Sequence, residues 1–297
     1  MQVLIIGGSG FLSGTLARTA LAQGHQVWTI TRGQRPAIDG AIPLIADRHD
    51  AESFIRAVTA ATTEWDLVVD CIGYHPEDAI QDIEVFRQRA AHLIFVSTDF
   101  VFDPAQRRLP QNEASDDYAR EGYGAEKRRC ELALIDRSGD MAWTVVRPCH
   151  IYGPGSRLGC LPLHGRDPQL IDRLLAGQPL HLVGGGYFLQ QPILAGDLAQ
   201  LILSCAGNRQ TYGQVFCVAG PDIIESRTYY RIIADTLGVD LNVEEVPVDQ
   251  HRREHPETAP FLCHRIYDLS KLRASGARVP ATPIEQGLRQ HVESLQV

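Results

Sequence analysis

Two side chains capable of acid–base chemistry stand four residues apart in the segment Tyr123-Gly124-Ala125-Glu126-Lys127. On a helix this spacing places both on the same face, one turn from each other. A free tyrosine, with a pKa of about 10, is a poor proton donor and acceptor at neutral pH, but a nearby ammonium favours its phenolate. The pair can then exchange a proton with a hydroxyl or carbonyl group. Taken alone, the spacing also fits an unrelated pair on a helix surface.

A hydroxyl group follows a buried strand upstream of this pair. Residues 93–97 form a continuous apolar run that ends in Ser97, and Thr98 comes next. Ligands of open α/β sheets collect at the carboxyl ends of the strands. The Thr98 hydroxyl is therefore placed to orient the same substrate oxygen as Tyr123. The alternative is a threonine that only bonds the local backbone at the end of a strand.

A glycine cluster near the N-terminus indicates a dinucleotide. Residues 3–6 predict a strand buried on both faces, and apolar residues recur at helical spacing from Phe11 onward. Between them, Gly7, Gly8 and Gly10 allow a tight turn and a close approach to a pyrophosphate, with free N–H groups at the helix start. A second apolar run at 26–31 completes a βαβ unit. Ser13 stands where the pattern has its third glycine, so we expect slightly different packing of helix and strand.

Strands and helices alternate along the first half of the chain. Further strands are expected at 42–46, 67–71, 93–97 and 143–147, and helices at 51–60, 79–91, 123–135, 195–205 and after Thr282. This alternation predicts an α/β fold with a Rossmann-type doubly wound parallel sheet and a smaller C-terminal α/β substrate lobe. We expect the dinucleotide-binding domain at 1–155 and the substrate lobe mainly at 156–297, with segments near 187–220 returning to the core.

Composition excludes several classes of partner. The 297 residues carry a net charge of −8, which is not the electrostatic footprint of a nucleic-acid-binding protein. Apolar runs fall short of the roughly 18 residues that span a bilayer, and no basic leader precedes the first one. The seven cysteines lack CxxC spacing. We expect reduced thiols, a cytoplasmic location, no metal, no membrane contact and no nucleic acid.

Several short motifs, in order, resemble the short-chain dehydrogenase/reductase superfamily, and within it the extended branch, the NAD-dependent epimerase/dehydratase family. The resemblance covers most of the chain. The motifs are GGSGFLSG at 7–14, STDFVF at 97–102, Pro110 with Glu113, YGAEK at 123–127, RPCHIYGPG at 147–155, GDLA at 196–199 and DLSKL at 268–272.

The resemblance implies roles for individual residues. Thr98, Tyr123 and Lys127 form the implied catalytic set, and Lys127 would also hold the nicotinamide ribose. Asp47 and residues 71–73 match positions where relatives contact the adenine and the central part of the cofactor. The expected cofactor-binding residues are Gly7, Gly8, Ser9, Gly10, Phe11, Leu12, Arg32, Asp47, Arg48, Cys71, Ile72, Gly73, Tyr123, Lys127, Pro148 and His150.

The substrate side is less determined. The expected substrate-binding residues are Tyr74, Asp99, Phe100, His150, Tyr187 and Gln191. His150 replaces the asparagine of the branch's R-x-x-N pattern, so it either changes a hydrogen bond to substrate or is a packed histidine. A nucleotide sugar follows from the resemblance alone, and a secondary-metabolite carbonyl is equally permitted. Relatives dimerise through the helices that flank YxxxK, which leaves a homodimer open.

The cofactor preference is predicted from the end of the second strand. An acid there would accept bonds from the adenosine ribose and reject a 2′-phosphate. The segment 27–33 reads VWTITRG, without an acid and with Arg32 and Arg35 close by. We therefore expect NADP(H) rather than NAD(H), with Arg32 on the 2′-phosphate, unless Arg32 is only a solvated loop residue.

The reaction predicted is an oxidation or reduction. Dehydratases of the branch carry an acid pair after the threonine, whereas Asp99 is followed here by Phe100, which disfavours elimination. STDFVF looks most like the STDYVF segment of dTDP-4-dehydrorhamnose reductases, which reduce a sugar ketone. A redox-neutral epimerase with retained cofactor is one alternative. Another is a non-catalytic NADP-sensing or RNA-associated protein, because relatives that resemble chloroplast stem-loop RNA-binding proteins share the Arg-Gly after the second strand.

Overall fold

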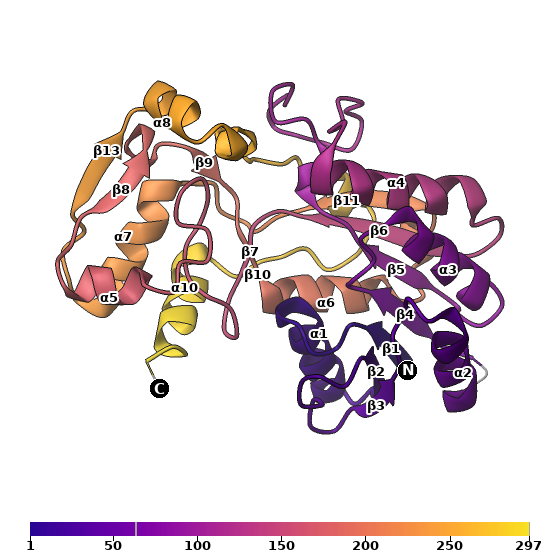
Figure 1. Cartoon of the computed structure of the whole chain (residues 1–297). Helices are drawn as coiled ribbons and strands as arrows, with labels where there is room; N and C mark the ends of the chain where they lie inside the picture. Colours follow the sequence, from indigo (N-terminus) through magenta and orange to yellow (C-terminus); the bar gives the residue numbers. More distant parts are fainter. Residues whose placement is uncertain (63, 297) are drawn as a thin grey trace.

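A seven-stranded parallel sheet organises the larger part of the chain in the computed structural model, which describes residues 1–62 and 64–296 (Figure 1). The strand order is β11-β6-β5-β4-β1-β2-β3. The strands are β1 (Gln2–Ile6), β2 (Gln26–Thr31), β3 (Ile42–Ile45), β4 (Leu67–Asp70), β5 (Leu93–Val96), β6 (Trp143–Pro148) and β11 (Gln214–Val218). The order reverses at β1, which pairs with both β2 and β4. The glycine cluster follows β1, at the switch point where open α/β sheets bind ligands.

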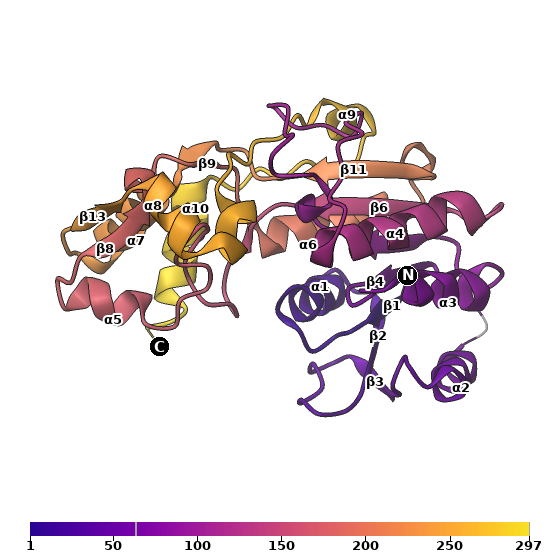
Figure 2. The same ribbon diagram turned by 45° about the horizontal axis from the view of Figure 1, so that its top comes forward.

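Helices cover both faces of this sheet because the side chains of each buried strand alternate between two cores. Val3 and Ile5 pack on one face with α1 (Phe11–Ala22) and α6 (Ala195–Cys205). Leu4 and Ile6 pack on the other face with α2 (Ala51–Ala61), α3 (Pro76–Phe86) and α4 (Gly122–Arg137). Figure 2 shows the sheet between these two layers. The Rossmann-type fold predicted from the alternation is confirmed.

A smaller lobe lies beside the carboxyl ends of the strands and has its own apolar core (Figure 1). The two central elements are the parallel pair β8 (Leu180–Val183) and β13 (Val243–Val246). Helices α5 (Leu170–Leu175), α7 (Ser226–Leu237), α8 (Val248–Glu254) and α10 (Ile284–Glu293) surround them. The two-residue pairs β7 (Ile151–Tyr152) with β10 (Ile193–Leu194) and β9 (Leu189–Gln190) with β12 (Ile224–Glu225) connect the parts. Short 3₁₀ turns occur at η1 (Asp99–Val101), η2 (Gly184–Gly186), η3 (Arg209–Thr211) and η4 (Pro256–Phe261).

The chain crosses between the lobe and the sheet more than once. Helix α6 packs against α1, and β11 adds an edge strand beside β6. A later segment also returns: Leu269 and Leu272, at α9 (Ser270–Ala274), belong to the core cluster that contains α1 and α6. This second return was not expected from the sequence. No helix in the described ranges combines the length and the apolar character needed to cross a membrane.

Local signals explain where the elements begin. Helix α3 starts at Pro76, three residues before the predicted start, because proline suits the first helical turn and Asp78 caps the backbone N–H of His75. At the start of α1, the Ser13 hydroxyl accepts from the Gly10 N–H at 3.0 Å. Ser13 thus closes the turn with a hydrogen bond at the position where the motif has a third glycine.

Candidate active site

A cavity of about 530 Å³ lies where the carboxyl ends of the central strands face the lobe. It brings together Thr98, which follows β5, and Tyr123 and Lys127 from the first two turns of α4. The start of α1 and the segment after β6 complete the sheet side, and Arg166, Phe261 and Arg265 line it from the other side. Residues predicted from three separate motifs therefore share one cavity.

A second cavity of about 420 Å³ continues along the same sheet edge, toward the ends of β2 and β3. Gly10, Ile72 and Tyr74 line both cavities, which makes them one extended depression. Of the predicted cofactor residues, this half is lined by Gly7, Ser9, Arg32, Asp47 and Arg48. Arg35, His49 and Gln34 also line it.

The glycine turn forms a cradle that fits a dinucleotide. Gly7 and Gly8 have φ angles of 114° and 52°, and a Cβ on Gly8 would lie 2.3 Å from the Thr29 Cβ. The turn can therefore pack directly on β2 only with glycine at this position. The first N–H groups of α1 have no intrahelical acceptor and point outward at the helix start. Backbone donors, the positive end of a twelve-residue helix and nearby arginines suit a pyrophosphate.

Lys127 is held at the base of the cavity by backbone oxygens. Its ammonium donates to the carbonyl oxygens of Gly73 at 2.5 Å and Val96 at 2.7 Å, and it is 1% exposed. Burial lowers the pKa of Lys127, although the charge of Asp70 opposes that effect. The lysine thus joins the loop after β4 to the end of β5, at the place where the nicotinamide ribose was expected.

The phenol of Tyr123 lies at the cavity wall and is half exposed. Burial raises its pKa to about 12, and the Thr98 hydroxyl acts in the opposite direction. The expectation that Lys127 would favour the phenolate is wrong for this structure, because the desolvation of the phenol dominates. Tyr123 therefore stays protonated at neutral pH and is a weaker acid than free tyrosine, so it can give its proton only to an oxygen that becomes strongly basic during the reaction.

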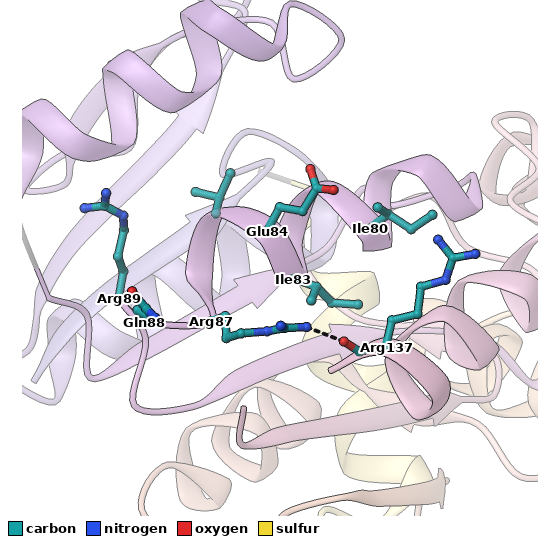
Figure 3. A pocket seen from close by; sticks show the side chains of 8 residues that line it. Ile80, Ile83, Glu84, Arg87, Gln88, Arg89 and Arg137 are labelled. Carbon is teal, nitrogen blue, oxygen red and sulfur yellow. Dashed lines mark hydrogen bonds between the residues drawn. The ribbon is translucent and has the colours of Figure 1, made fainter. Parts of the chain in front are cut away.

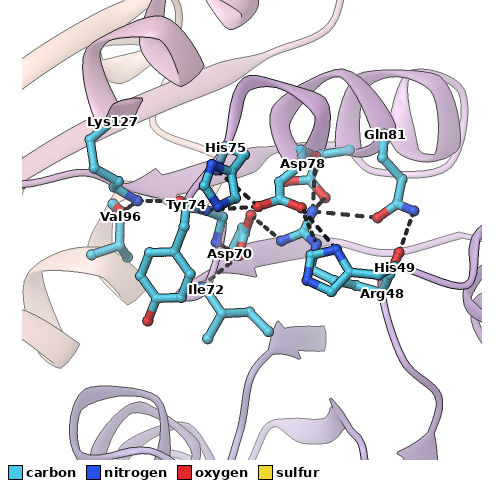
Figure 4. Close-up of polar contacts among 12 residues, drawn as sticks. Arg48, His49, Asp70, Ile72, Tyr74, His75, Asp78, Gln81, Val96 and Lys127 are labelled. Carbon is cyan, nitrogen blue, oxygen red and sulfur yellow. Dashed lines mark hydrogen bonds and ion pairs between the residues drawn. The ribbon is translucent and has the colours of Figure 1, made fainter. Parts of the chain in front are cut away.

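Arg48 was expected to bind the cofactor, but its guanidinium is engaged inside the protein (Figure 4). It donates to Asp70 at 2.8 Å and to Asp82 at 3.1 Å, and its Nε lies 3.1 Å from Asp78. Asp70 in turn accepts from the N–H groups of Ile72 and Gly73, at 2.8 and 2.9 Å. Arg48 therefore holds the loop that borders the cavity, through a cluster of four charged groups that the sequence does not show to be neighbours. Because Arg48 also lines the second cavity, its contact with the cofactor stays a prediction.

Asp99 was expected to bind substrate, and its carboxylate is likewise already paired. It accepts from Arg265 at 3.1 Å, from Arg107 at 3.2 Å and from the Tyr267 hydroxyl at 2.5 Å. Burial would raise the pKa of Asp99, but the two arginines outweigh burial and lower it. Asp99 and Phe100 both line the cavity, and the Arg265 guanidinium lies 4.2 Å over the Phe100 ring.

The remaining predicted residues divide into two groups. Phe11, Leu12, Cys71, Pro148 and His150 line the cavity. Burial lowers the pKa of His150 to about 3, so its imidazole is neutral. Tyr187 and Gln191 lie outside both cavities in the described chain. Tyr187 is 57% exposed beside η2, and Gln191 uses its amide to bond the Gly220 oxygen and the Tyr267 N–H. The sequence predicted that both bind substrate from loops of the lobe. In the structure Tyr187 lies on the surface, and Gln191 bonds backbone groups.

Sequence reasoning missed Arg265 and Phe261. Both line the cavity from the segment between α8 and α9, which carries no recognisable motif. Only the return of this segment to the core places them beside Phe100. Arg265 is 2% exposed, and its Nε and Nη2 have no acceptor among the described residues.

A separate hollow lies on α3 and the end of α4 (Figure 3). Ile80 and Ile83 form its floor, and the Arg87 guanidinium donates to the Arg137 carbonyl oxygen across it. Its lining in the described chain includes none of the predicted site residues. The hollow is therefore set apart from the candidate active site.

Comparison with known proteins agrees with this geometry. A family model described as the NAD dependent epimerase/dehydratase family matches residues 3–219. The chain is 27% identical over 235 residues to the chloroplast stem-loop binding protein of 41 kDa b of Arabidopsis thaliana, a match that spans 74% of this chain but only 58% of that protein. It is 26% identical over 343 residues to the 2-alkyl-3-oxoalkanoate reductase of Stenotrophomonas maltophilia, with 98% of each chain covered.

The fold is shared with solved structures at low identity. An epimerase of Methanothermobacter thermautotrophicus superposes with a TM-score of 0.81 at 16% identity, over 99% of this chain and 92% of that one. The match to the family model spans most of the chain and includes the glycine turn, Thr98, Tyr123 and Lys127. The protein therefore belongs to the NAD dependent epimerase/dehydratase family, the extended branch of the short-chain dehydrogenases/reductases.

Proposed function

We propose that the protein is an NADP(H)-dependent reductase that transfers hydride between the nicotinamide and a carbonyl or hydroxyl carbon of a small molecule. The observation that carries this proposal is the convergence of Thr98, Tyr123 and Lys127 on one cavity with the start of α1. The nicotinamide, when bound, supplies the hydride. Family membership supports a dinucleotide cofactor, and the full-length similarity to a reductase supports the reaction class.

Each residue of the set has a distinct task in this proposal. Tyr123 donates its phenolic proton to the substrate oxygen as the carbonyl is reduced, because the alkoxide that develops is basic enough to take a proton even from a phenol of raised pKa. The Thr98 hydroxyl orients the same oxygen. Lys127, fixed by two carbonyl oxygens, holds the ribose and contributes positive charge near the developing alkoxide.

The proposal is tested by replacing the phenol alone. Tyr123→Phe should lower kcat for NADPH-dependent reduction of keto sugars and aryl ketones by about 100-fold or more, because general acid catalysis is worth that much. NADPH affinity, measured by fluorescence titration, should stay unchanged. Tyr118→Phe, which removes a phenol outside the cavity lining, is the matched control. Full activity in Tyr123→Phe would contradict the role of Tyr123.

The NADP(H) preference is a second part of the proposal, supported by Arg32 and Arg35 in the second cavity. Arg35 donates to the Ser9 oxygen at 3.2 Å, whereas Arg32 is exposed and extends from the end of β2. A charge-assisted bond to a 2′-phosphate is worth about 1.5–3 kcal/mol, or about tenfold or more in affinity. Arg32→Ala should weaken NADPH by that factor and leave NADH unchanged. A wild-type preference for NADH would discard this part.

Two other functions have specific support and specific tests. Family membership and the shared fold favour a redox-neutral epimerase, in which case the dinucleotide should survive purification and no net NADPH should be consumed. Similarity to a stem-loop binding protein favours an RNA-associated role. The net charge of −8 argues against that role, and a gel shift with structured RNA at physiological salt decides it.

A further inference from the structure

An apolar cavity of about 780 Å³ adjoins the candidate active site on the side of the loop that precedes α4. Its volume is within the range of cavities that hold small ligands. The lining is dominated by rings, from Phe100 and Phe102 at η1, from Tyr123, and from Pro260 and Phe261 at η4. Ala119, Gly122, Gly124 and Pro104 add small apolar surfaces.

This cavity lies next to the catalytic one. Phe100, Tyr123 and Phe261 line both. The ring centroid of Phe100 lies 6.3 Å from that of Tyr123 and 5.7 Å from that of Phe261, so the three rings form the border between the two spaces. A substituent on a carbon that reacts beside the Tyr123 hydroxyl would therefore have only these three side chains between it and the apolar cavity.

Two of the four charged side chains that line the apolar cavity, those of Arg107 and Asp103, are already bonded, and the other two, those of Arg120 and Glu121, are exposed to solvent. Arg107 donates to the Asp99 carbonyl oxygen at 2.9 Å and to the Tyr267 hydroxyl at 3.0 Å. The Asp103 carboxylate accepts from the Ala105 N–H at 2.9 Å. A hydroxyl-rich group placed against these rings would lose water without gaining partners, which is costly, whereas an apolar group would gain from leaving water.

We propose that this cavity binds an aryl or alkyl substituent of the carbonyl substrate. The substrate class is then an apolar ketone or its alcohol, with the reacting carbon beside Tyr123 and the chain against Phe100, Phe102 and Phe261. This inference rests on the proposed function for the position of the reacting carbon. Large exposed apolar patches are uncommon on monomeric proteins and mark binding sites where they occur. We therefore expect an apolar patch beside a catalytic cavity to bind part of a ligand.

The test measures binding without turnover. Wild-type protein saturated with NADP⁺ is titrated with 2-butanone and with 2-octanone, and affinities are followed by NMR. Each of the four added methylenes should tighten binding about fourfold, so octanone should bind on the order of 100-fold more tightly. Ala119→Phe places a ring in the apolar cavity and should reduce this ratio to within about tenfold, while butanone and NADP⁺ bind as before.

A matched control uses the same loop. Ala114 is exposed and lies outside the apolar cavity, so Ala114→Phe should retain the wild-type ratio. Equal affinities of the wild type for the two ketones, or an unchanged ratio in Ala119→Phe, would overturn the inference. A protein that shows the length dependence and its loss in Ala119→Phe, yet reduces no ketone with NADPH, would support the apolar site and overturn the proposed reductase function.

A second measurement does not depend on any variant folding. An octanone analogue with a terminal diazirine is photolysed with the wild-type protein and NADP⁺, and the labelled peptides are identified by mass spectrometry. Labels within 100–104, 119–124 or 260–261 support the inference. Labels confined to other segments overturn it.

Discussion

Two neighbouring buried aspartates should differ in how much the same substitution, aspartate to asparagine, destabilises the fold. Asp70 and Asp82 are both fully buried, and both accept from Arg48. Asp78 also lies within ion-pair distance of that guanidinium. Three carboxylates thus share one cation, and they cannot all be ionised at low cost.

We expect Asp82 to be the carboxyl that holds a proton. Burial and the charge of Asp70 raise the pKa of Asp82 well above its usual range. Burial also acts on Asp70, but Arg48 outweighs it and lowers the pKa of Asp70. A hydrogen bond between the two carboxyl groups also raises the pKa of Asp82 and lowers that of Asp70, as it would if a protonated Asp82 donates to the Asp70 carboxylate.

The two substitutions therefore differ in magnitude. Asp82→Asn replaces a neutral carboxyl by a neutral amide of the same shape, which still accepts from Arg48, and should change the free energy of unfolding by less than about 1 kcal/mol. Asp70→Asn removes the charge that pairs with Arg48 and should cost about 3–5 kcal/mol. We expect a cost near the lower end of this range, because Asp82 can then ionise and pair with Arg48 in place of Asp70.

The assay is urea unfolding at pH 7, followed by circular dichroism, with both variants measured beside the wild type. The pH dependence gives a second check. Because the folded-state pKa of Asp82 is raised, only the unfolded state loses this proton as the pH rises above about 4, and the stability contributed by the group falls. Asp82→Asn lacks that loss, so its stability relative to the wild type should increase from pH 5 to pH 8. A cost of Asp82→Asn as large as that of Asp70→Asn, or a relative stability that falls with pH, would refute the assignment.

Two further predictions concern the cradle and the phenol. Gly8→Ala should destabilise the fold by more than about 1–3 kcal/mol and weaken NADPH binding, because its Cβ would overlap Thr29 at a φ of 52°. Gly24→Ala, with a φ of 78° but no described atom within 4 Å of the added Cβ, should cost less, as thermal unfolding will show. The kcat for ketone reduction should not fall through ionisation of Tyr123 at pH values up to about 10, because the pKa of this acid is about 12 and reduction needs its protonated form. A loss of kcat near neutral pH that disappears in Tyr123→Phe would contradict this.

The fold was predictable because the central strands are continuous apolar runs and the turns between them carry glycine or cap signals. These features act locally, so the sequence shows them directly. The placement of Thr98, Tyr123 and Lys127 in one cavity follows from the same logic, since strand ends and helix starts meet at one edge of a parallel sheet. The paired state of Arg48 was not predictable, because its partners come from β4 and α3, more than twenty residues away in the chain. Arg265 and Phe261 line the cavity only because the chain returns to the core after α8. No local sequence pattern predicts that return.

The buried aspartates also bear on the site, through the loop between β4 and α3. Asp70 fixes the N–H groups of Ile72 and Gly73, and the Gly73 oxygen accepts from Lys127. Ile72 lines both halves of the proposed dinucleotide site. The electrostatic cluster around Arg48 is thus coupled to Lys127 through a single backbone segment (Figure 4).

This coupling distinguishes a positioning role from a purely structural one. Under conditions where each variant is fully folded, Asp70→Asn should weaken NADPH binding because the loop at 72–73 loses its charged acceptor, whereas Asp82→Asn should bind NADPH as the wild type does. Fluorescence titration of NADPH measures both. Unaltered affinity in folded Asp70→Asn would mean that Lys127 and the β5 end hold the loop without help from the aspartate, and that the cluster serves stability alone.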